Sequence, residues 1–313
     1  MRPKDLFKIW GAAFVFSFFF FITGCINEDL SHCGVGIRFK YTKNVDGVDK
    51  LASEIKKINI YVFDSDSILV GEYIIDADQL DGTHTARLNI PPGRYSFVAW
   101  GNVGDDYELP VFVKGKTTLG DAVLSLKRTG KTVSSHPSPL FFGSIASADV
   151  QPALSSDQVL TIDMIKDTKK IRVIAKGLPA KEIAAGSFSC RITSANGDYK
   201  FDNSLGSDEE LLYLPSSSAD EMGRMISDFV VMRELKDGST GSRLVFTYHG
   251  GGGRPSKEVF AVDLTELLLA RSKTKDLDIE DYFEIELTID ITNAGATVHI
   301  KGWDTVYTAG DIG

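Results

Sequence analysis

Hydrophobic and polar residues alternate along most of this chain, and turn residues separate the alternating stretches. In the first stretch, Gly36, Arg38 and Lys40 separate four apolar positions, which are Val35, Ile37, Phe39 and Tyr41. Alternation places every second side chain on one face, as a strand with one buried face requires. Similar stretches predict strands at 58–64, 69–75, 86–90, 95–100, 160–164, 171–175, 188–192, 211–214, 226–232, 244–248, 258–262, 283–291 and 296–300.

Helical signals are few. Apolar residues share one helical face at 48–55, and Asp263 can cap a short helix that carries Leu264, Leu267 and Leu268. Pro91-Pro92-Gly93 predicts a tight turn between two strands, and the Gly-, Ser- and Pro-rich segment 105–156 predicts long connections and edge strands. Many short strands between turns predict an all-β protein with two β-sandwiches and Greek-key connections. We expect domains at 35–160 and 161–313.

The N-terminus has the features of a secretory signal. Basic residues precede an apolar run at 9–22, which is too short to span a bilayer because spanning takes about 20 residues. Ile22-Thr23-Gly24-Cys25 resembles the bacterial lipobox, in which the cysteine is lipidated before cleavage. This predicts a signal peptide at 1–24 and a lipidated Cys25. The alternatives are an ordinary signal with a chance cysteine and an uncleaved anchor helix.

A short segment at 25–34 would connect the lipid to the first strand. Acyl chains on one cysteine hold a protein at a membrane without a spanning helix. Glu28 and Asp29 resemble the signal that exports Bacteroidales lipoproteins to the outer face of the outer membrane. The alternative interpretation of these two acids is a solvated linker.

Charge and cysteine content narrow the class of protein. The net charge is -9, and removal of the leader makes the body more acidic, because the leader holds more basic than acidic residues. An acidic body without a basic cluster argues against nucleic-acid partners. Cys33 and Cys190 could form a disulfide in an oxidising compartment, although separate buried thiols are the simpler expectation.

Motifs for catalysis, metals and cofactors are incomplete in this sequence. Two Gly-Lys-Thr triplets lack the first glycine of a phosphate loop, and His249-Gly250-Gly251-Gly252 has no accompanying nucleophile elbow. The Asp76, Asp78 and Asp81 spacing does not fit a calcium loop, and the five histidines lie far apart. We therefore expect no enzyme, no metal, no cofactor and no small-molecule substrate, although distant residues can still converge.

Several segments together resemble the FimB-type fimbrial anchor lipoproteins of Bacteroidales, which cap the membrane end of type V pili. These segments are 25–33, 58–64, 140–143, 197–203, 230–233, 262–264 and 302–303. The resemblance implies two transthyretin-like β-sandwich domains, assembly by strand exchange, a fimbrial stalk subunit as partner, and a place on the outer membrane at the fibre base.

The resemblance also implies roles for the two ends of the chain. Stalk subunits of this superfamily lose their first strand by proteolysis after a basic residue, but residues 25–34 contain no Arg or Lys. We therefore expect the first strand, with Val35, Ile37, Phe39 and Tyr41, to stay in place and close its groove. The tail 305–313, with Val306 and Ile312, would then engage the stalk.

Other classes of function remain open. A surface glycan-binding lipoprotein would present exposed aromatic residues, whereas Trp100 and Trp303 stand in strand-like contexts that favour core packing. A stalk or tip subunit of the same pilus superfamily, or a hydrolase with a scattered site, are further alternatives.

Overall fold

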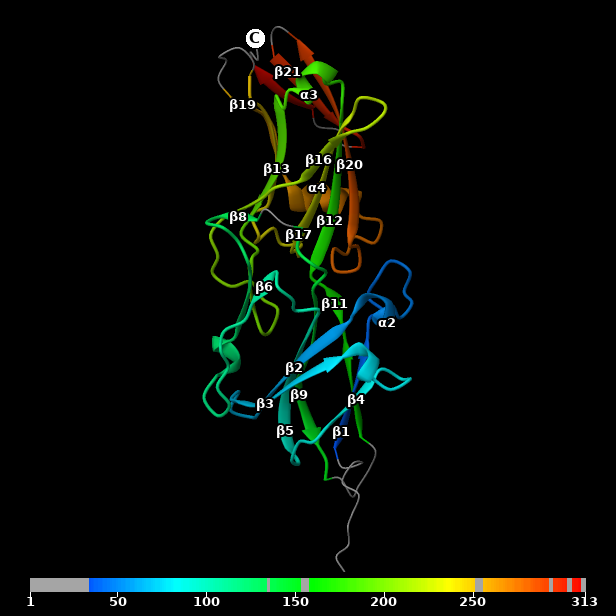
Figure 1. The fold of residues 1–313 in the computed structure, drawn as a ribbon, viewed down its shortest axis with the longest axis vertical. Coiled ribbons are helices and arrows are strands. Elements are labelled where there is room, and N and C mark those ends of the chain that lie inside the picture. The colour runs from blue at the N-terminus through cyan, green and yellow to red at the C-terminus, as the bar shows by residue number, and fades with distance from the viewer. Residues whose placement is uncertain are drawn as a thin grey trace, which may run out of the picture.

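The computed structural model describes residues 34–133, 136–152, 158–250, 256–292, 295–302 and 306–310. Cys25, Glu28, Asp29, Cys33 and Ile312 lie outside these ranges. The molecule is elongated, with two groups of sheets placed end to end (Figure 1). We call the group that contains the first strand the lower lobe and the other group the upper lobe.

The lower lobe contains two sheets. The smaller has the order β10-β1-β4, with β1 parallel to β10 and antiparallel to β4. The larger has the order β11-β9-β5-β2-β3. Their bounds are β1 Val35–Lys40, β2 Lys57–Phe63, β3 Leu69–Asp76, β4 Thr85–Leu88, β5 Gly93–Gly101, β9 Phe141–Val150, β10 Val159–Asp163 and β11 Ile165–Lys166.

The upper lobe also contains two sheets, with the orders β16-β17-β12-β20-β21-β22 and β19-β18-β13-β15-β8. Their bounds are β8 Thr132–Val133, β12 Thr168–Lys176, β13 Phe188–Ser194, β15 Leu211–Tyr213, β16 Ser216–Ala219, β17 Met225–Met232, β18 Arg243–Tyr248, β19 Lys257–Asp263, β20 Tyr282–Thr292, β21 Gly295–Ile300 and β22 Val306–Gly310. A small fifth sheet has the order β14-β7-β6 and joins the two halves of the chain. Its strands are β6 Tyr107–Glu108, β7 Val123–Leu126 and β14 Asp198–Lys200.

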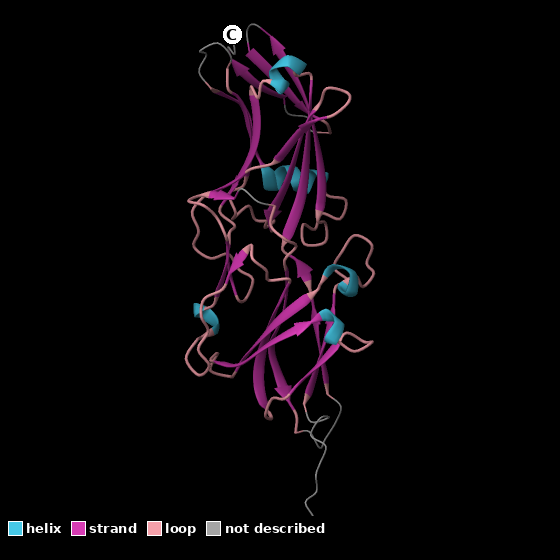
Figure 2. Ribbon diagram, in the orientation of Figure 1, coloured by secondary structure: helices cyan, strands magenta, loops and turns pink. Residues whose placement is uncertain are grey.

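The helices are short (Figure 2). They are α2 Leu51–Glu54, α3 Ala180–Ala184 and α4 Leu264–Arg271, with 3-10 turns at Ala77–Gln79 and Leu119–Asp121. α4 lies among the strands of the upper lobe with Leu264, Leu267 and Leu268 buried (Figures 1 and 2). The predicted cap of α4 is confirmed, because the Asp263 carboxylate accepts a hydrogen bond from the Glu266 backbone N–H at 2.7 Å. Along the described ranges, no helix is long and apolar enough to cross a bilayer. The predicted all-β class with few short helices is confirmed.

The lower lobe buries both faces of β5, and Trp100 lies on the face that is turned away from β1. Its side chain is fully buried, as the sequence predicts, and its ring lies 4.9 Å from that of Phe142. One hydrophobic cluster runs from the face of β2 and β5 that is turned away from β1 into the upper lobe, and a second lies between β1 and the opposite face of β2 and β5. The two lobes therefore share part of one core.

One sequence prediction was wrong in this region. β9 lies inside its sheet, between β5 and β11, although the segment around it was predicted to hold only connections and edge strands. Gly143 weakens the strand pattern in the sequence, but the fold requires a glycine there. A Cβ at this position would lie 2.5 Å from Ile162 Cγ2 and 2.7 Å from Met164 Sδ. β4 and β5 belong to different sheets, so the predicted turn at Pro91-Pro92-Gly93 carries the chain from one sheet to the other.

The chain passes from the lower to the upper lobe through β10, β11 and β12. β10 spans residue 160 and pairs with β1, and β11 pairs with β9, so both strands hydrogen-bond within the lower lobe. β12 begins two residues after β11 and runs through the upper lobe. The division of domains at residue 160 stays a prediction.

Candidate functional site

The first strand is a candidate functional element because of its position in the lower lobe. β1 is the middle strand of its sheet, in register with β10 through Gly36↔Val159 to Lys40↔Asp163 and with β4 through Val35↔Leu88 to Arg38↔Thr85. Val35, Ile37, Phe39 and Tyr41 are at most 2 % exposed. Removal of β1 would leave two strands without partners and an open apolar slot between the sheets.

The outward face of β1 is covered closely at its start. A Cβ on Gly36 would lie 3.1 Å from Val159 Cγ2 and 3.2 Å from Thr85 Cγ2. Arg38 is partly exposed, and its Nε donates a weak hydrogen bond to Thr85 Oγ1 at 3.5 Å. A protease binds the backbone of several residues around its target bond. Both backbone edges of β1 are already paired with β4 and β10, so a protease cannot bind it there.

Tyr41 fixes the end of this strand. Its ring meets Phe141 edge-on at 5.0 Å, and its backbone N–H donates to Asp49 Oδ1 at 3.0 Å. Burial, together with the negative charges of Asp281 and Glu54, raises the pKa of the Tyr41 hydroxyl. The predicted first strand is thus an integral part of the lower core.

At the far end of the molecule, the C-terminal strand is joined to the upper lobe. β22 pairs antiparallel with β21, from Gly295↔Gly310 to His299↔Val306, and lies beside β19. It forms one edge of the six-stranded sheet among the described strands. Val306 is therefore the first residue of an ordered edge strand, while Ile312 lies outside the described ranges.

Charged residues fill the joint between the lobes. The Lys166 amino group contacts Glu54 Oε2 at 3.1 Å and Asp281 Oδ2 at 2.7 Å, and its side chain is only 6 % exposed. Burial alone would raise the pKa of Asp281, but the hydrogen bond and charge of Lys166 lower it. Because Glu54 belongs to α2 and Asp281 precedes β20, Lys166 ties the lower lobe to the upper.

A second ionic group lies beside it. Arg233 forms two hydrogen bonds to Asp278, of 2.7 and 2.9 Å, and its Nε lies 3.9 Å from Oδ1 of the fully buried Asp167. Burial raises the pKa of Asp167 and lowers that of the nearby Lys169 amino group, which is also fully buried. The sequence predicted a domain boundary near this segment and did not reveal these contacts, because a polar run of this kind resembles a solvated connection.

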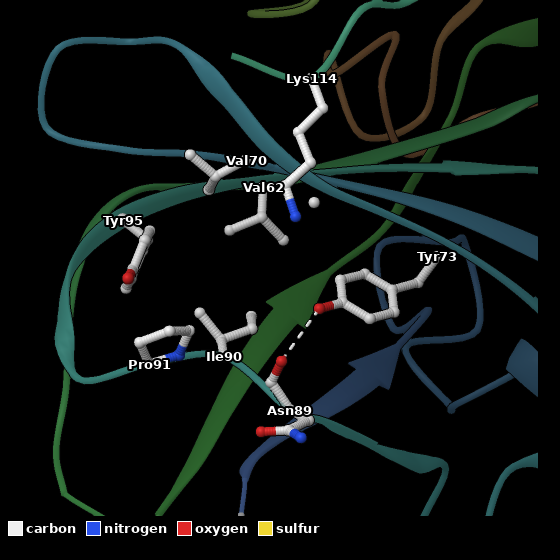
Figure 3. Close-up of a pocket in the computed structure, with 9 residues that line it drawn as sticks. Val62, Val70, Tyr73, Asn89, Ile90, Pro91, Tyr95 and Lys114 are labelled. Atoms are coloured by element: carbon white, nitrogen blue, oxygen red, sulfur yellow. Dashed lines mark hydrogen bonds between the residues drawn. The ribbon is translucent and has the colours of Figure 1, made fainter.

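A surface cavity of about 310 Å³ opens in the lower lobe between β3 and the segment that follows β4 (Figure 3). The Tyr73 hydroxyl donates to the Asn89 carbonyl oxygen at 3.2 Å and bridges the two sides of the opening. The remaining lining is mostly apolar: Val62, Val70, Gly71, Ile90, Pro91, Tyr95 and Lys114. Nothing in this set provides a nucleophile with an adjacent base.

Two other groups among the described residues were candidates for catalysis, the Cys190 thiol and the Ser189–His249 pair. Burial raises the pKa of the free Cys190 thiol to about 12, which leaves it unreactive. Ser189 Oγ lies 2.7 Å from His249 Nε2, a pair that the sequence did not reveal, but the other ring nitrogen faces Ser256 Oγ at 3.3 Å. A carboxylate that would orient the imidazole is missing from these contacts. The described residues hold no cluster of metal-ligating side chains.

Glu234 is buried between the two upper sheets, and it gives a testable pH dependence. Its carboxylate accepts hydrogen bonds from Thr240, Ser242, Thr265 and Asn196, yet burial raises its pKa to about 7. The folded state therefore binds more protons than the unfolded state between about pH 4.5 and 7, so the free energy of unfolding falls as pH rises through this window.

Glu234→Gln is expected to remove the part of the pH dependence that comes from Glu234. A pKa shift of this size corresponds to about 3 kcal/mol between the ends of the window. Urea denaturation at pH 5 and pH 8 measures the difference, and the exposed Glu221→Gln is the control for loss of a negative charge. An unchanged pH slope in Glu234→Gln would show that another group is responsible.

Residues 30–308 match the family described as fimbrillin-A associated anchor proteins Mfa1 and Mfa2. The minor fimbrium anchoring subunit Mfa2 of Porphyromonas gingivalis is 23% identical over 293 residues, which cover 89% of this chain and 87% of that protein.

Solved structures agree on the fold. The fimbrial anchor protein Mfa2 from Porphyromonas gingivalis superposes with a TM-score of 0.72 and 20% identity, and the match covers 89% of this chain and 99% of that one. A proposed adhesin from Bacteroides ovatus gives a TM-score of 0.75 and 19% identity over 90% and 97% of the two chains. Both lobes are therefore shared with these proteins.

Proposed function

Since this chain belongs to the family of fimbrillin-A associated anchor proteins, we propose that it is a lipid-anchored subunit that holds a fimbrium on the outer membrane and ends its assembly at that side. The lipid is attached to Cys25, and Glu28 with Asp29 directs the protein to the cell surface. The partner is a fimbrial stalk subunit, which engages the protein near β22. Catalysis is not required.

The central place of β1 is the observation that carries this proposal. In strand exchange, a donated strand completes the ladder of a sheet, and its alternate side chains fill the core. Here the chain's own β1 already does both, with partners on each edge and four buried side chains. No neighbouring subunit can insert a strand there while β1 remains, which is the behaviour expected of the last subunit in a fibre.

The direction of the molecule fits this role. β1 begins at the end of the lower lobe that lies farthest from β22 (Figure 1). A lipid at Cys25 would therefore hold one end of the long axis at the membrane, and β22 would face away from it. The edge strand is then available for a stalk subunit.

Replacement of Cys25 tests the lipid. Cys25→Ala is expected to block processing, to abolish detergent partitioning and to release fibres into the medium. Cys190→Ala is the matched control, because this cysteine is buried and unpaired, and we expect it to leave attachment intact. Mature Cys25→Ala protein of normal size that still partitions with the membrane would contradict the assignment.

Two further variants separate the other parts of the proposal. Glu28→Ala with Asp29→Ala should protect the protein from protease added to intact cells, whereas equal digestion would leave these acids as linker.

Truncation after Trp303 should leave a lipidated protein that no longer retains fibres. Mass spectrometry of the surface form reports on β1: a new N-terminus at Phe39 would indicate a stalk-like subunit.

A further inference from the structure

The outer face of the six-stranded sheet carries polar and aromatic side chains in two adjacent rows. The strand register places Lys170 between Val230 of β17 and Tyr282 of β20. The next outward row contains Asp228, Arg172 and Glu284, again with the β12 residue in the middle. These residues lie on the opposite side of the sheet from the core.

Tyr282 is unusual in this setting because its side chain is 50 % exposed, although it projects from a sheet. Its hydroxyl donates a hydrogen bond to Glu284 Oε2 at 3.4 Å. A surface cavity of about 200 Å³ lies beside it, lined by Lys170, Ile171, Arg172, Asp228, Phe229, Val230 and His136. His136, which follows β8 in the sequence, forms one wall of the cavity.

The polar groups of this cavity are held in place. Arg172 and Asp228 form two hydrogen bonds, of 2.7 and 3.0 Å, between neighbouring strands. Both side chains remain roughly 40 % exposed, so the outer lone pairs and N–H groups of the pair still face solvent. The site thus offers fixed donors and acceptors next to an aromatic ring.

We propose that this face binds a neutral hexopyranose unit of a glycan. A sugar ring has an apolar C–H face, which can stack on the exposed Tyr282 ring, and a rim of hydroxyl groups, which can bond to Arg172, Asp228 and His136. The cavity has the size of a single ring rather than of a folded partner. This activity is separate from fibre anchoring, because the site involves neither β1 nor β22.

The cavity in Figure 3 provides the internal comparison. It also contains two half-buried tyrosines, Tyr73 and Tyr95, but its lining includes the apolar Val62, Val70 and Ile90, and it lacks a paired guanidinium and carboxylate. A hydroxyl-rich sugar ring placed there would lose hydrogen bonds to water without replacement. We therefore expect glycans to discriminate between the two cavities.

The test uses detergent-solubilised full-length protein on a printed array of neutral and acidic glycans, followed by calorimetric titration of the strongest neutral ligand. Tyr282→Ala and Arg172→Ala should each weaken binding by about tenfold, as loss of a stacking partner or a hydrogen-bonding group predicts. Tyr282→Phe keeps the ring and should stay within about threefold. Tyr95→Ala in the other cavity should have no effect.

Several results would overturn the proposal. These are an array without a bound neutral glycan, equal binding by Tyr282→Ala, and binding of sulfated glycans alone that Lys170→Gln abolishes. Thermal unfolding by circular dichroism checks that each variant is folded, as exposed positions allow. Cells that carry Tyr282→Ala should still retain fibres, which separates glycan binding from fibre anchoring.

Discussion

Phe39→Ala is expected to lower the free energy of unfolding by about 3 to 5 kcal/mol, the usual cost of removing a buried phenylalanine side chain. Phe39 is fully buried in the middle of β1 and belongs to the hydrophobic cluster between the two lower sheets. The surrounding strands pair on both sides of β1, so they cannot close the cavity that the ring leaves behind. Urea denaturation followed by circular dichroism gives the loss directly.

The same substitution should expose the first strand to proteolysis. When β1 detaches more often, the bond after Arg38 becomes accessible to an arginine-specific protease. We expect intact wild-type protein and a cleaved Phe39→Ala variant under the same conditions, with Arg38→Gln added to show that this bond is the one cut. Lys40→Ala, at the exposed end of β1, is the control. Cleavage of folded wild-type protein at Arg38 would contradict the closed position of β1.

Arg233→Ala is expected to cost about 3 to 5 kcal/mol, because it leaves the fully buried Asp167 without its nearest compensating arginine. Asp167 Oδ2 already has no hydrogen-bond partner, and its Oδ1 accepts only a long bond from Asn203 at 3.3 Å. Desolvation of the carboxylate would then dominate. Equilibrium denaturation of the variant measures the effect.

Arg172→Ala is a matched control for this prediction. It also removes an arginine with two hydrogen bonds to an aspartate, but that pair lies on the exposed sheet face. Exposed pairs contribute about 0 to 1 kcal/mol, so the contrast isolates burial from pairing geometry. Equal losses in both variants would show that the joint is not desolvated.

The pH dependence gives a second readout for Arg233. Burial raises the pKa of Asp167 in the folded protein to about 6, above its unfolded value, so stability falls as pH rises through about 4 to 6. Loss of the positive charge raises this pKa further. The destabilisation by Arg233→Ala should therefore be larger at pH 8 than at pH 4, and a loss independent of pH would implicate packing alone.

The sequence predicted those elements in which local pattern and tertiary environment agree. β1 and β2 alternate or run apolar because one or both faces meet the core, and Asp263 caps α4 through a bond within one turn. β9 was missed because Gly143 is required by close contact with Ile162 of β10, which only the tertiary fold reveals. Local pattern therefore identified the strands but not their neighbours.

The joint between the lobes was missed for a related reason. Lys166, Asp167 and Lys169 form a polar run that is typical of a solvated linker, yet all three are nearly or fully buried. The partners of Lys166 and Asp167, which are Glu54, Asp281 and Arg233, lie far away along the chain, so no spacing rule could connect them. The roles of Cys25, Glu28, Asp29, Val306 and Ile312 stay predictions.

The parallel pairing of β1 and β10 has a mechanical consequence for a protein held at one end and pulled at the other. Tension from the N-terminus would run along β1, and tension from the upper lobe would reach β10 through β11 and β12. Because β1 and β10 run in the same direction, the load enters β1 at its start and leaves β10 at its end. It then shears all five residue pairs at once instead of peeling them apart one by one. Such a joint resists force as a unit, and it would fail only when the whole ladder slips.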